Sequence, residues 1–325
     1  MEKIPEAGYE IRGLDIVGFN RSSLIKNIGL PFKVIKSLIQ VRRIFKSFRP
    51  DAVIGVGGYS SFPVLRYAQA RNIRYFIHES NSFAGKTNKM LGKKAMKIFV
   101  ANEGMEKFFP ALTIKISGNP VRKSISGSVV SREEGLAYFG LDPSKRTILS
   151  IGGSLGAKSI NEALEKHLEE FEKNALQLIW QTGKPFAEKA SQRTATKRNL
   201  WTGDFITNME YAFAAADLVI SRSGAMAIAE LCMMKKPVVF VPFPFAAEDH
   251  QTANAQSLVN KNAALMIKDS EALDKLVPAI IALAKNEQRQ TELQNNIAKL
   301  AIANADEIIA KEILEAITKR QTIDE

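Results

Sequence analysis

The sequence predicts an α/β protein with two Rossmann-like domains, each built on a parallel sheet, that face a central cleft. Short apolar runs of strand type alternate with helical stretches along the 325 residues, and this alternation predicts right-handed βαβ units. Glycines and small polar residues follow many of these runs, where open α/β sheets bind ligands. A charged segment at 118–145 separates two groups of strands, and the length suits two domains.

The elements follow in order along the chain. The expected strands of the first domain are 51–56, 74–77, 97–100 and 113–117, and those of the second are 147–152, 176–181, 199–202, 217–221, 238–242 and 264–267. A short helix at 132–139 should end at Gly140. We place the domains at 1–122 and 123–325. The tail, 287–319, is predicted as one long helical stretch that packs back on the first domain.

A basic amphipathic helix is expected near the start of the chain. The net charge is +11, and no acidic residue lies between Asp15 and Asp51, whereas eight basic residues do. They are Arg21, Lys26, Lys33, Lys36, Arg42, Arg43, Lys46 and Arg49. Phe32, Ile35, Ile39, Phe45 and Phe48 recur among them at roughly helical spacing. Such a helix suits an anionic membrane surface, or it packs on the core with its basic face in water.

Several function classes are disfavoured. No apolar run is long enough for a transmembrane helix, and no signal-peptide pattern opens the chain. Cys232 is the only cysteine, so no disulfide can form within the chain, which fits a reducing compartment. The histidines, His78, His167 and His250, are far apart and show no metal-ligand spacing. No nucleic-acid-binding signature accompanies the charge. We expect no metal, no cofactor and no nucleic-acid partner.

The most informative loop joins the strand at 217–221 to a small-residue helix at 225–233. It reads Arg222-Ser223-Gly224-Ala225, and a strand that turns directly into a helix leaves N–H groups that suit a phosphate. Glu230 follows on the helix, where a carboxylate could accept both hydroxyls of a ribose. The sequence therefore suggests a nucleotide-sugar site, although strand–glycine–helix junctions also occur as plain structural turns.

Four other strand ends carry polar or glycine-rich loops, each of which could also be a structural turn. Gly57, Gly58 and Tyr59 belong to a loop for a phosphate or a polar acceptor. His78-Glu79-Ser80-Asn81 offers polar recognition, with Glu79 as a conceivable base, and Arg122 suits a phosphate. The loop at 152–157 reads Gly-Gly-Ser-Leu-Gly-Ala and suits an anion. It also resembles a hydrolase nucleophile elbow, but His250 is the only late histidine.

Six motifs together resemble the MurG family, the N-acetylglucosaminyltransferases that convert lipid I to lipid II in peptidoglycan synthesis. The motifs occur in family order and are Gly55-Val56-Gly57-Gly58-Tyr59, His78-Glu79-Ser80-Asn81, Gly118-Asn119-Pro120-Val121-Arg122, Gly152-Gly153-Ser154-Leu155-Gly156-Ala157, Arg222-Ser223-Gly224-Ala225 and His250-Gln251-Thr252-Ala253-Asn254-Ala255. The resemblance implies a GT-B fold and inverting transfer from UDP-N-acetylglucosamine (UDP-GlcNAc) to the C4 hydroxyl of the lipid-linked muramoyl sugar. It also implies that the protein is a peripheral membrane protein that acts at the cytoplasmic face of the inner membrane.

The resemblance implies a set of donor contacts. They are Asn81, Arg122, Ser154, Ile206, Ala225, Met226, Ala227, Ile228, Ala229, Glu230 and Gln251. In the family, the uracil lies near the position of Ile206, the ribose on that of Glu230, and the sugar against that of Gln251. The pyrophosphate meets the positions of Ser154 and 224–226. Lipid I, the anionic membrane surface and other cell-wall synthesis proteins are the remaining expected partners.

One departure from the family pattern concerns the start of the chain. Family members begin with a strand and a loop of Gly-Gly-Thr-Gly-Gly-His type, which this sequence lacks. A first βαβ unit and a candidate base are therefore expected to be missing from the sequence as given. Two alternatives to the transferase stay open at this point. One is a homologue that binds UDP-GlcNAc without transfer, and the other is a GT-B enzyme similar to UDP-GlcNAc 2-epimerases.

Overall fold

The computed structural model describes residues 3–6, 8–18, 25–153 and 155–321. The chain forms two compact units. The first comprises Met1–Ser80, Ala84–Ser117 and Glu307–Glu325, and the second comprises Asn81–Phe83 and Gly118–Asp306. The expected boundary, 122/123, lies a few residues beyond Gly118. All ten strands expected from the sequence are present, with ends that differ by at most two residues.

The first unit holds a four-stranded parallel sheet in the order β1-β2-β3-β4. Its strands are β1 (Ala52–Gly55), β2 (Arg74–Glu79), β3 (Lys97–Val100) and β4 (Ile114–Ile116). Its helices are α1 (Lys3–Glu6), α2 (Leu30–Phe48), α3 (Ser61–Ala70), α4 (Lys86–Gly92) and, from Glu307 onward, α15 (Ala305–Gln321). Short 3₁₀ turns lie at Ile25–Asn27, Met105–Lys107 and Ala111–Thr113.

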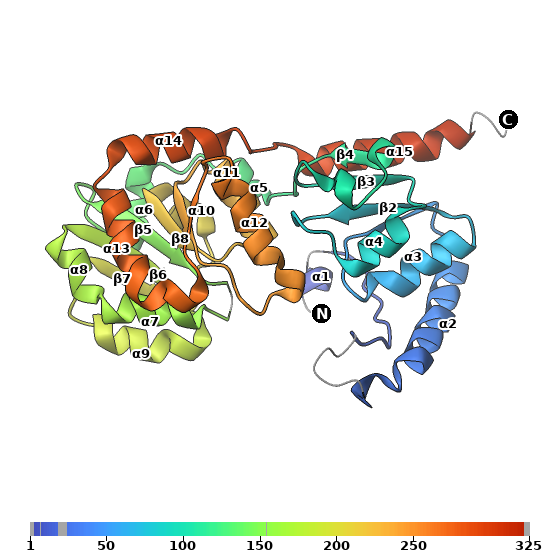
Figure 1. Ribbon diagram of the computed structural model, residues 1–325, viewed down its shortest axis with the longest axis horizontal. Helices are drawn as coiled ribbons and strands as arrows, with labels where there is room; N and C mark the ends of the chain where they lie inside the picture. Colours follow the sequence, from blue (N-terminus) through green and yellow to red (C-terminus); the bar gives the residue numbers. More distant parts are fainter. Residues whose placement is uncertain (1–2, 7, 19–24, 154, 322–325) are drawn as a thin grey trace. The chain divides into compact units, whose positions relative to one another are not determined.

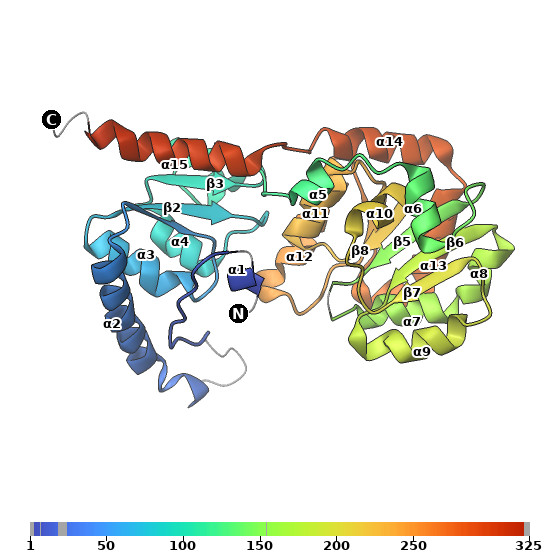
Figure 2. The ribbon, with the colours of Figure 1, turned by 180° about the vertical axis from the view of Figure 1, so that it is seen from behind.

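Alternation along the strands divides the core of the first unit between two faces of the sheet. Tyr75 and Ile77 of β2 pack with residues of α3 and α4, whereas Phe76 points to the opposite face, as the period of a strand requires. There Phe76 and Phe99 stack with ring centroids 6.2 Å apart, and Ile309 of α15 covers them. Figures 1 and 2 show α15 lying along this face.

The second unit is a three-layer sandwich around a six-stranded parallel sheet in the order β10-β9-β8-β5-β6-β7. The strands are β5 (Arg146–Ile151), β6 (Leu176–Gln181), β7 (Leu200–Gly203), β8 (Leu218–Ser221), β9 (Val238–Phe240) and β10 (Leu265–Met266). The helices are α5 (Lys123–Ser126), α6 (Arg132–Phe139), α7 (Lys158–Lys166), α8 (Leu168–Lys173), α9 (Lys184–Thr194), α10 (Met209–Ala215), α11 (Ala225–Met233), α12 (His250–Val259), α13 (Ala272–Ala284) and α14 (Glu287–Ala298). Short 3₁₀ turns lie at Ala247–Asp249 and Asp269–Glu271.

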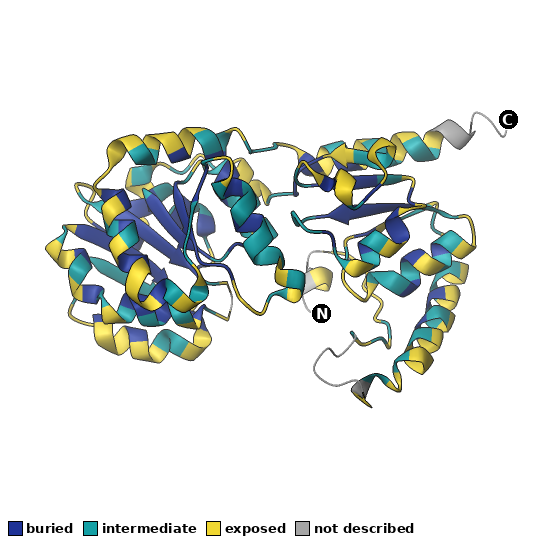
Figure 3. Cartoon of the chain, viewed as in Figure 1, coloured by how far each residue is buried: buried dark blue, intermediate teal, exposed yellow. Residues whose placement is uncertain are grey.

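Both faces of this sheet are covered by helices. Residues of α6, α10, α11, α12 and α14 pack on one face, and residues of α7, α8, α9 and α13 pack on the other. The inner strands β9, β8, β5 and β6 are therefore apolar on both sides, as parallel sheets require, and Figure 3 shows them buried, whereas the edge strands β7 and β10 are half-buried. The helix predicted at 132–139 is present as α6; Ser131 and Glu134 form a capping box at its start, and Gly140 ends it in the left-handed conformation.

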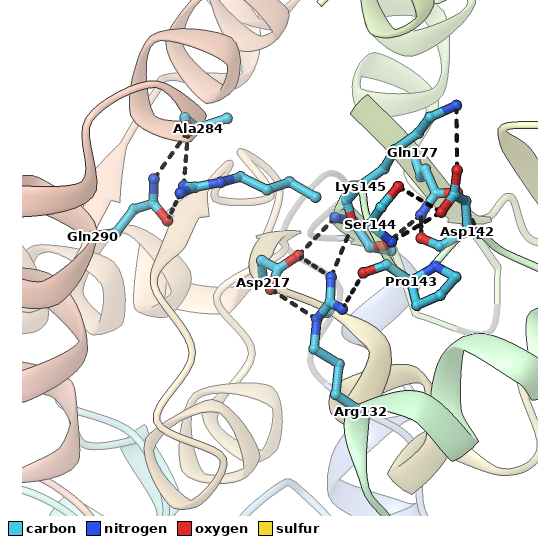
Figure 4. Close-up of polar contacts among 12 residues, drawn as sticks. Arg132, Asp142, Pro143, Ser144, Lys145, Gln177, Asp217, Ala284 and Gln290 are labelled. Carbon is cyan, nitrogen blue, oxygen red and sulfur yellow. Dashed lines mark hydrogen bonds and ion pairs between the residues drawn. The ribbon is translucent and has the colours of Figure 1, made fainter. Parts of the chain in front are cut away.

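A polar cluster fixes the amino-terminal ends of the strands in the second unit (Figure 4). Arg132 of α6 donates to Asp217 just before β8, and also to the carbonyls of Pro143 and Lys145 before β5. The Gln177 amide donates to the carbonyl of Asp142 and to the hydroxyl of Thr147. These contacts lie at the end of the sheet opposite the carboxyl ends of the strands.

The carboxyl-terminal tail differs from the prediction, because it is two helices and not one long stretch. Helix α14 ends at Ala298 and α15 begins at Ala305. Asn304 between them has a φ of 58°, a left-handed conformation that an α-helix cannot contain. Leu293 and Ile297 of α14 are buried in the second unit, while Ile309 of α15 belongs to the core of the first. The apolar pattern continues across the break, which is why the sequence suggests one helix.

Candidate functional site

The strand order of the second unit places its topological switch point between β5 and β8. The chain runs outward through β6 and β7 on one side of β5, and through β9 and β10 on the far side of β8. Ile151 and Ser221, the last residues of these two strands, are register partners. The loops that follow them therefore open at the same edge of the sheet, where doubly wound folds bind ligands.

A cavity of about 1150 Å³ opens at this switch point. Its lining comes from the glycine-rich loop after β5, the Arg222–Gly224 loop after β8, helix α11 and the loop after β9. Of the expected donor contacts, Arg122, Ile206, Ala227, Glu230 and Gln251 line it. All of these residues belong to the second unit. The tertiary structure thus gathers residues from positions 122 to 251 around one cavity.

The glycine-rich loop is shaped by backbone conformations that only glycine adopts easily. Gly153 and Gly156 have φ values of 79° and 74°. A Cβ atom on Gly156 would collide with the carbonyl of Thr182, which shows how closely the loop packs on the end of β6. The Gln181 amide also donates to the Gly153 carbonyl (3.0 Å). Ser154, expected to contact the pyrophosphate, lies outside the described residues.

Helix α11 begins directly after the loop that follows β8, so its amino terminus lies beside that loop. Its N-cap, Gly224, has no side chain and forms no side-chain cap, so the first N–H groups of the helix are not capped by a side chain. Ala227 and Glu230 line the cavity, one helical turn apart. Ile228, in contrast, is 8% exposed and packs into the core. The expected segment, 225–230, therefore presents two side chains to the cavity. A donor contact at 225–226 would involve the backbone or the exposed side chain of Met226.

Glu230 is held by Arg122, a pairing that the sequence does not reveal. Arg122 donates from Nη2 (3.0 Å) and Nε (3.3 Å), both to Oε1 of Glu230. Burial raises the pKa of the Glu230 carboxyl, while the charge and hydrogen bond of Arg122 oppose the shift. The Glu230 side chain is 13% exposed and that of Arg122 is 55% exposed. The pair thus places a desolvated carboxylate in the cavity wall beside a solvated guanidinium.

Arg222, the first residue of the predicted phosphate loop, joins the loops of the cavity through two residues that the sequence analysis did not single out, Ser159 and Asp269. Arg222 donates to Asp269 (2.5 Å), to Ser159 and to the carbonyls of Val241 and Pro242. Ser159 also donates to Asp269 (2.5 Å). This network ties helix α7, the loop after β8 and the loop after β9 to one another. Asp269 carries no motif, so sequence reasoning had no signal for it.

Gln251 and Asn81 occupy different places in the second unit. Gln251 lines the cavity, and its Oε1 accepts from the backbone N–H of Phe243 (3.0 Å). Asn81 does not line the cavity; its Oδ1 accepts from Asn254 (3.1 Å). Ile206 is 2% exposed and belongs to both the core and the cavity wall.

The candidate acceptor loop and the candidate base lie in the first unit. Gly57 and Gly58 have φ values of 89° and 76°, and Tyr59 is exposed. Glu79 is 3% exposed, and its Oε2 accepts from the N–H of Gly85 (3.0 Å) and from Asn88 (2.8 Å). A Cβ atom on Gly57 would lie 3.3 Å from the Asn88 amide nitrogen. The structure therefore places Glu79, Asn88 and the glycine loop together.

Helix α2 packs on the first unit by a narrow stripe and leaves four of its ten leucine, isoleucine, valine and phenylalanine side chains exposed. Val41 is buried, and the ring of Phe45 lies 5.1 Å from that of Tyr67 in α3. The exposed apolar residues are Phe32 (75%), Ile35 (57%), Ile39 (49%) and Phe48 (68%). A purely core-facing helix, one of the two sequence interpretations, does not account for them. Among the described residues, no helix combines the length and apolar character needed to span a membrane.

Comparisons with known proteins identify relatives over nearly the whole chain. The glycosyltransferase family 28 C-terminal domain matches residues 147–312, and the N-terminal domain of that family matches residues 1–100. A UDP-N-acetylglucosamine–N-acetylmuramyl-(pentapeptide) pyrophosphoryl-undecaprenol N-acetylglucosamine transferase from Parabacteroides distasonis is 48% identical over 98% of this chain and 88% of its own length. The enzyme of the same name from Flavobacterium psychrophilum is 42% identical, over 99% and 88%.

Solved structures also include a member of the same enzyme family. The crystal structure of Acinetobacter baumannii MurG is 30% identical, with a TM-score of 0.75 over 98% of this chain and 87% of that chain. The crystal structure of a UDP-GlcNAc 2-epimerase from Neisseria meningitidis, bound to UDP-GlcNAc, has a TM-score of 0.63 over 91% of this chain and 84% of that chain, at 12% identity. At that identity the likeness shows a shared fold only. The two-unit architecture is that of the GT-B fold.

Proposed function

Since the chain belongs to the MurG family of glycosyltransferases, we propose that the cavity of its second unit is the UDP-GlcNAc site. The enzyme is a UDP-GlcNAc-dependent N-acetylglucosaminyltransferase that moves GlcNAc to lipid I and makes lipid II for the cell wall. The relatives therefore support the transferase interpretation and not the binding-only or epimerase alternatives. The observation that carries the site proposal is the position of Glu230 and the α11 amino terminus on one cavity at the switch point.

In the proposed donor complex, each part of UDP-GlcNAc meets a different part of the cavity. Glu230 accepts the ribose hydroxyls through Oε2, since both bonds from Arg122 go to Oε1. The uracil lies against Ile206, and the N–H groups at the start of α11, with the glycine-rich loop, face the pyrophosphate. Gln251 contacts the sugar.

Transfer proceeds by direct displacement at the anomeric carbon. The C4 hydroxyl of the acceptor attacks C1 of GlcNAc, the bond from C1 to the β-phosphate oxygen breaks, and UDP leaves with the electron pair. The helix dipole and the guanidinium of Arg122 stabilise the charge that develops on the leaving phosphate. A base takes the hydroxyl proton. Glu79 is our candidate, because it is a carboxylate fixed by two donors beside the Gly57 loop.

The test is sugar transfer from labelled UDP-GlcNAc to a lipid I analogue, with the 325-residue chain. Transfer supports the proposal if Glu230→Ala raises the KM for UDP-GlcNAc and Glu79→Gln lowers kcat while donor affinity is kept. An unchanged kcat in Glu79→Gln removes that residue as the base. If UDP-GlcNAc does not bind the parent, the proposed site itself is wrong.

The enzyme is also proposed to bind an anionic membrane surface through α2. The exposed apolar residues of this helix adjoin exposed basic residues, the combination that places a helix at a lipid interface. Reversal of Lys33, Lys36, Arg42 and Arg43 to Glu should abolish cosedimentation with vesicles of phosphatidylglycerol and phosphatidylcholine. The matched control reverses four exposed basic residues of the second unit, namely Lys184, Arg198, Lys235 and Lys285. Equal losses in both variants would mean that net charge, and not α2, drives binding.

A further inference from the structure

Asn254 is a buried amide at the centre of the segments that form the proposed donor site. It lies on α12, in the second unit, and is 2% exposed. It does not line the cavity, so its function there would be indirect. A buried amide requires hydrogen-bond partners for both its oxygen and its nitrogen, and the partners of Asn254 are informative.

Three hydrogen bonds hold the Asn254 side chain. Its Oδ1 accepts from the backbone N–H of Ser82 (2.8 Å). Its Nδ2 donates to the Oδ1 of Asn81 (3.1 Å) and to the backbone carbonyl of Ser223 (3.2 Å). Only one orientation of the amide works, because a backbone N–H must face the oxygen and a carbonyl must face the nitrogen. Asn254 therefore orients the Asn81 side chain, with Oδ1 toward Asn254 and Nδ2 turned away.

The same bonds fix two other parts of the site. Ser223 directly precedes Gly224, the N-cap of α11, so its carbonyl helps to set the direction in which the chain enters that helix. The Ser223 hydroxyl donates in turn to the carbonyl of Gln251 (2.8 Å). Asn254 thus connects, directly or through Ser223, three segments that the family resemblance assigns to the donor: Asn81, the start of α11 and Gln251.

We propose that Asn254 is a positioning residue for UDP-GlcNAc, which orients Asn81 and the α11 amino terminus without touching the substrate. This inference rests on the proposed donor site. A carboxylate at this position would keep the acceptor for the Ser82 N–H, but it would place negative oxygens against the oxygens of Asn81 and Ser223. Since carboxylate and amide have nearly the same shape, Asn254→Asp removes the two donor bonds with little change in packing.

Gln177 provides the matched control. It is also a buried amide in the second unit, at 1% exposure, with two donor bonds and one acceptor bond, to Asp142 and Thr147. It lies at the opposite end of the sheet from the cavity, in the cluster of Figure 4. Gln177→Glu makes the same chemical change, so it measures the general cost of a buried carboxylate.

The experiment compares the KM and kcat for UDP-GlcNAc, its Kd from calorimetry, and Tm in the parent and both variants. We expect both variants to lower Tm, but only Asn254→Asp to raise KM and Kd, by about tenfold or more, for a site distorted by lost hydrogen bonds. Gln177→Glu should stay within about twofold of the parent. Asn254→Ser, which is smaller and uncharged, serves if the aspartate variant does not fold.

A double-mutant cycle tests whether Asn254 acts through Asn81. Asn81→Ala should raise KM by itself, and adding Asn254→Asp should then have a smaller effect than in the parent. Equal KM values for parent and Asn254 variant overturn the inference, as do equal losses in the Gln177 variant or independent effects in the cycle. A parent that does not bind UDP-GlcNAc overturns the proposed site together with this inference, whereas a binding parent with a normal Asn254 variant overturns the inference alone.

Discussion

Replacement of Glu230 by alanine is the sharpest test of the nucleotide site. If the carboxylate accepts the ribose hydroxyls, the variant loses hydrogen bonds to a charged, largely buried group. Such bonds contribute about 1.5–3 kcal/mol, which corresponds to roughly a 10- to 150-fold increase in the Kd for UDP. The loss of the Arg122 pair adds little to this figure, because the guanidinium is 55% exposed and such pairs contribute about 0–1 kcal/mol.

Isothermal titration calorimetry with UDP gives the Kd directly, and Glu165→Ala is the control. The Glu165 side chain is 17% exposed, close to the 13% of Glu230, and it also pairs with a basic residue, Lys189 (2.6 Å). It lies on α7 but does not line the cavity. A Kd for the Glu230 variant within about twofold of the parent refutes the ribose assignment. So does an equal loss in the Glu165 variant, which would show a general effect of removing a half-buried ion pair.

Because burial raises the pKa of the Glu230 carboxyl, the affinity for UDP-GlcNAc should fall as pH drops through that raised value, and Glu230→Gln should flatten the profile. The same shift means that the ionised carboxylate costs stability at neutral pH, so Glu230→Gln should raise Tm there, with a difference that disappears in acid; a lower Tm would contradict the shift. Gly156→Ala should lower Tm and weaken UDP-GlcNAc binding in calorimetry, since its φ of 74° and its close packing both exclude a methyl group. Gly140→Ala is the control, because Gly140 has a φ of 65° but open space around it. This variant should lower Tm without weakening UDP-GlcNAc binding. Weaker binding in both glycine variants would mean that lost stability alone explains the effect of Gly156→Ala. Ile309→Ala should destabilise the first unit by about 2–4 kcal/mol in urea unfolding, whereas Leu314→Ala on the same helix, at 62% exposure, should cost less than about 0.5 kcal/mol. Equal losses would mean that α15 does not seal the sheet.

The sequence determined the elements of this fold because the signals for them are local. Apolar runs of strand length predicted all ten strands of the described residues, and the small polar residues after the strand at 217–221 predicted the strand–loop–helix junction at Arg222–Ala225. Ser131 and Gly140 bracket α6 because capping chemistry acts within a few residues. The ribose assignment for Glu230 rested on the same local reasoning, since a helix fixes where its second turn lies relative to its amino terminus.

The tertiary structure decided what depends on residues distant in the sequence. The pairing of Arg122 with Glu230 spans 108 positions, and the contact of Asn254 with Asn81 spans 173; no local pattern encodes either. The apolar face of α2 shows a related limit, because a periodicity of 3.6 residues specifies an apolar stripe but not what covers it. Only the packed structure showed that Phe45 meets the core while Phe32 and Ile35 remain exposed, since burial depends on the surface that the rest of the chain presents.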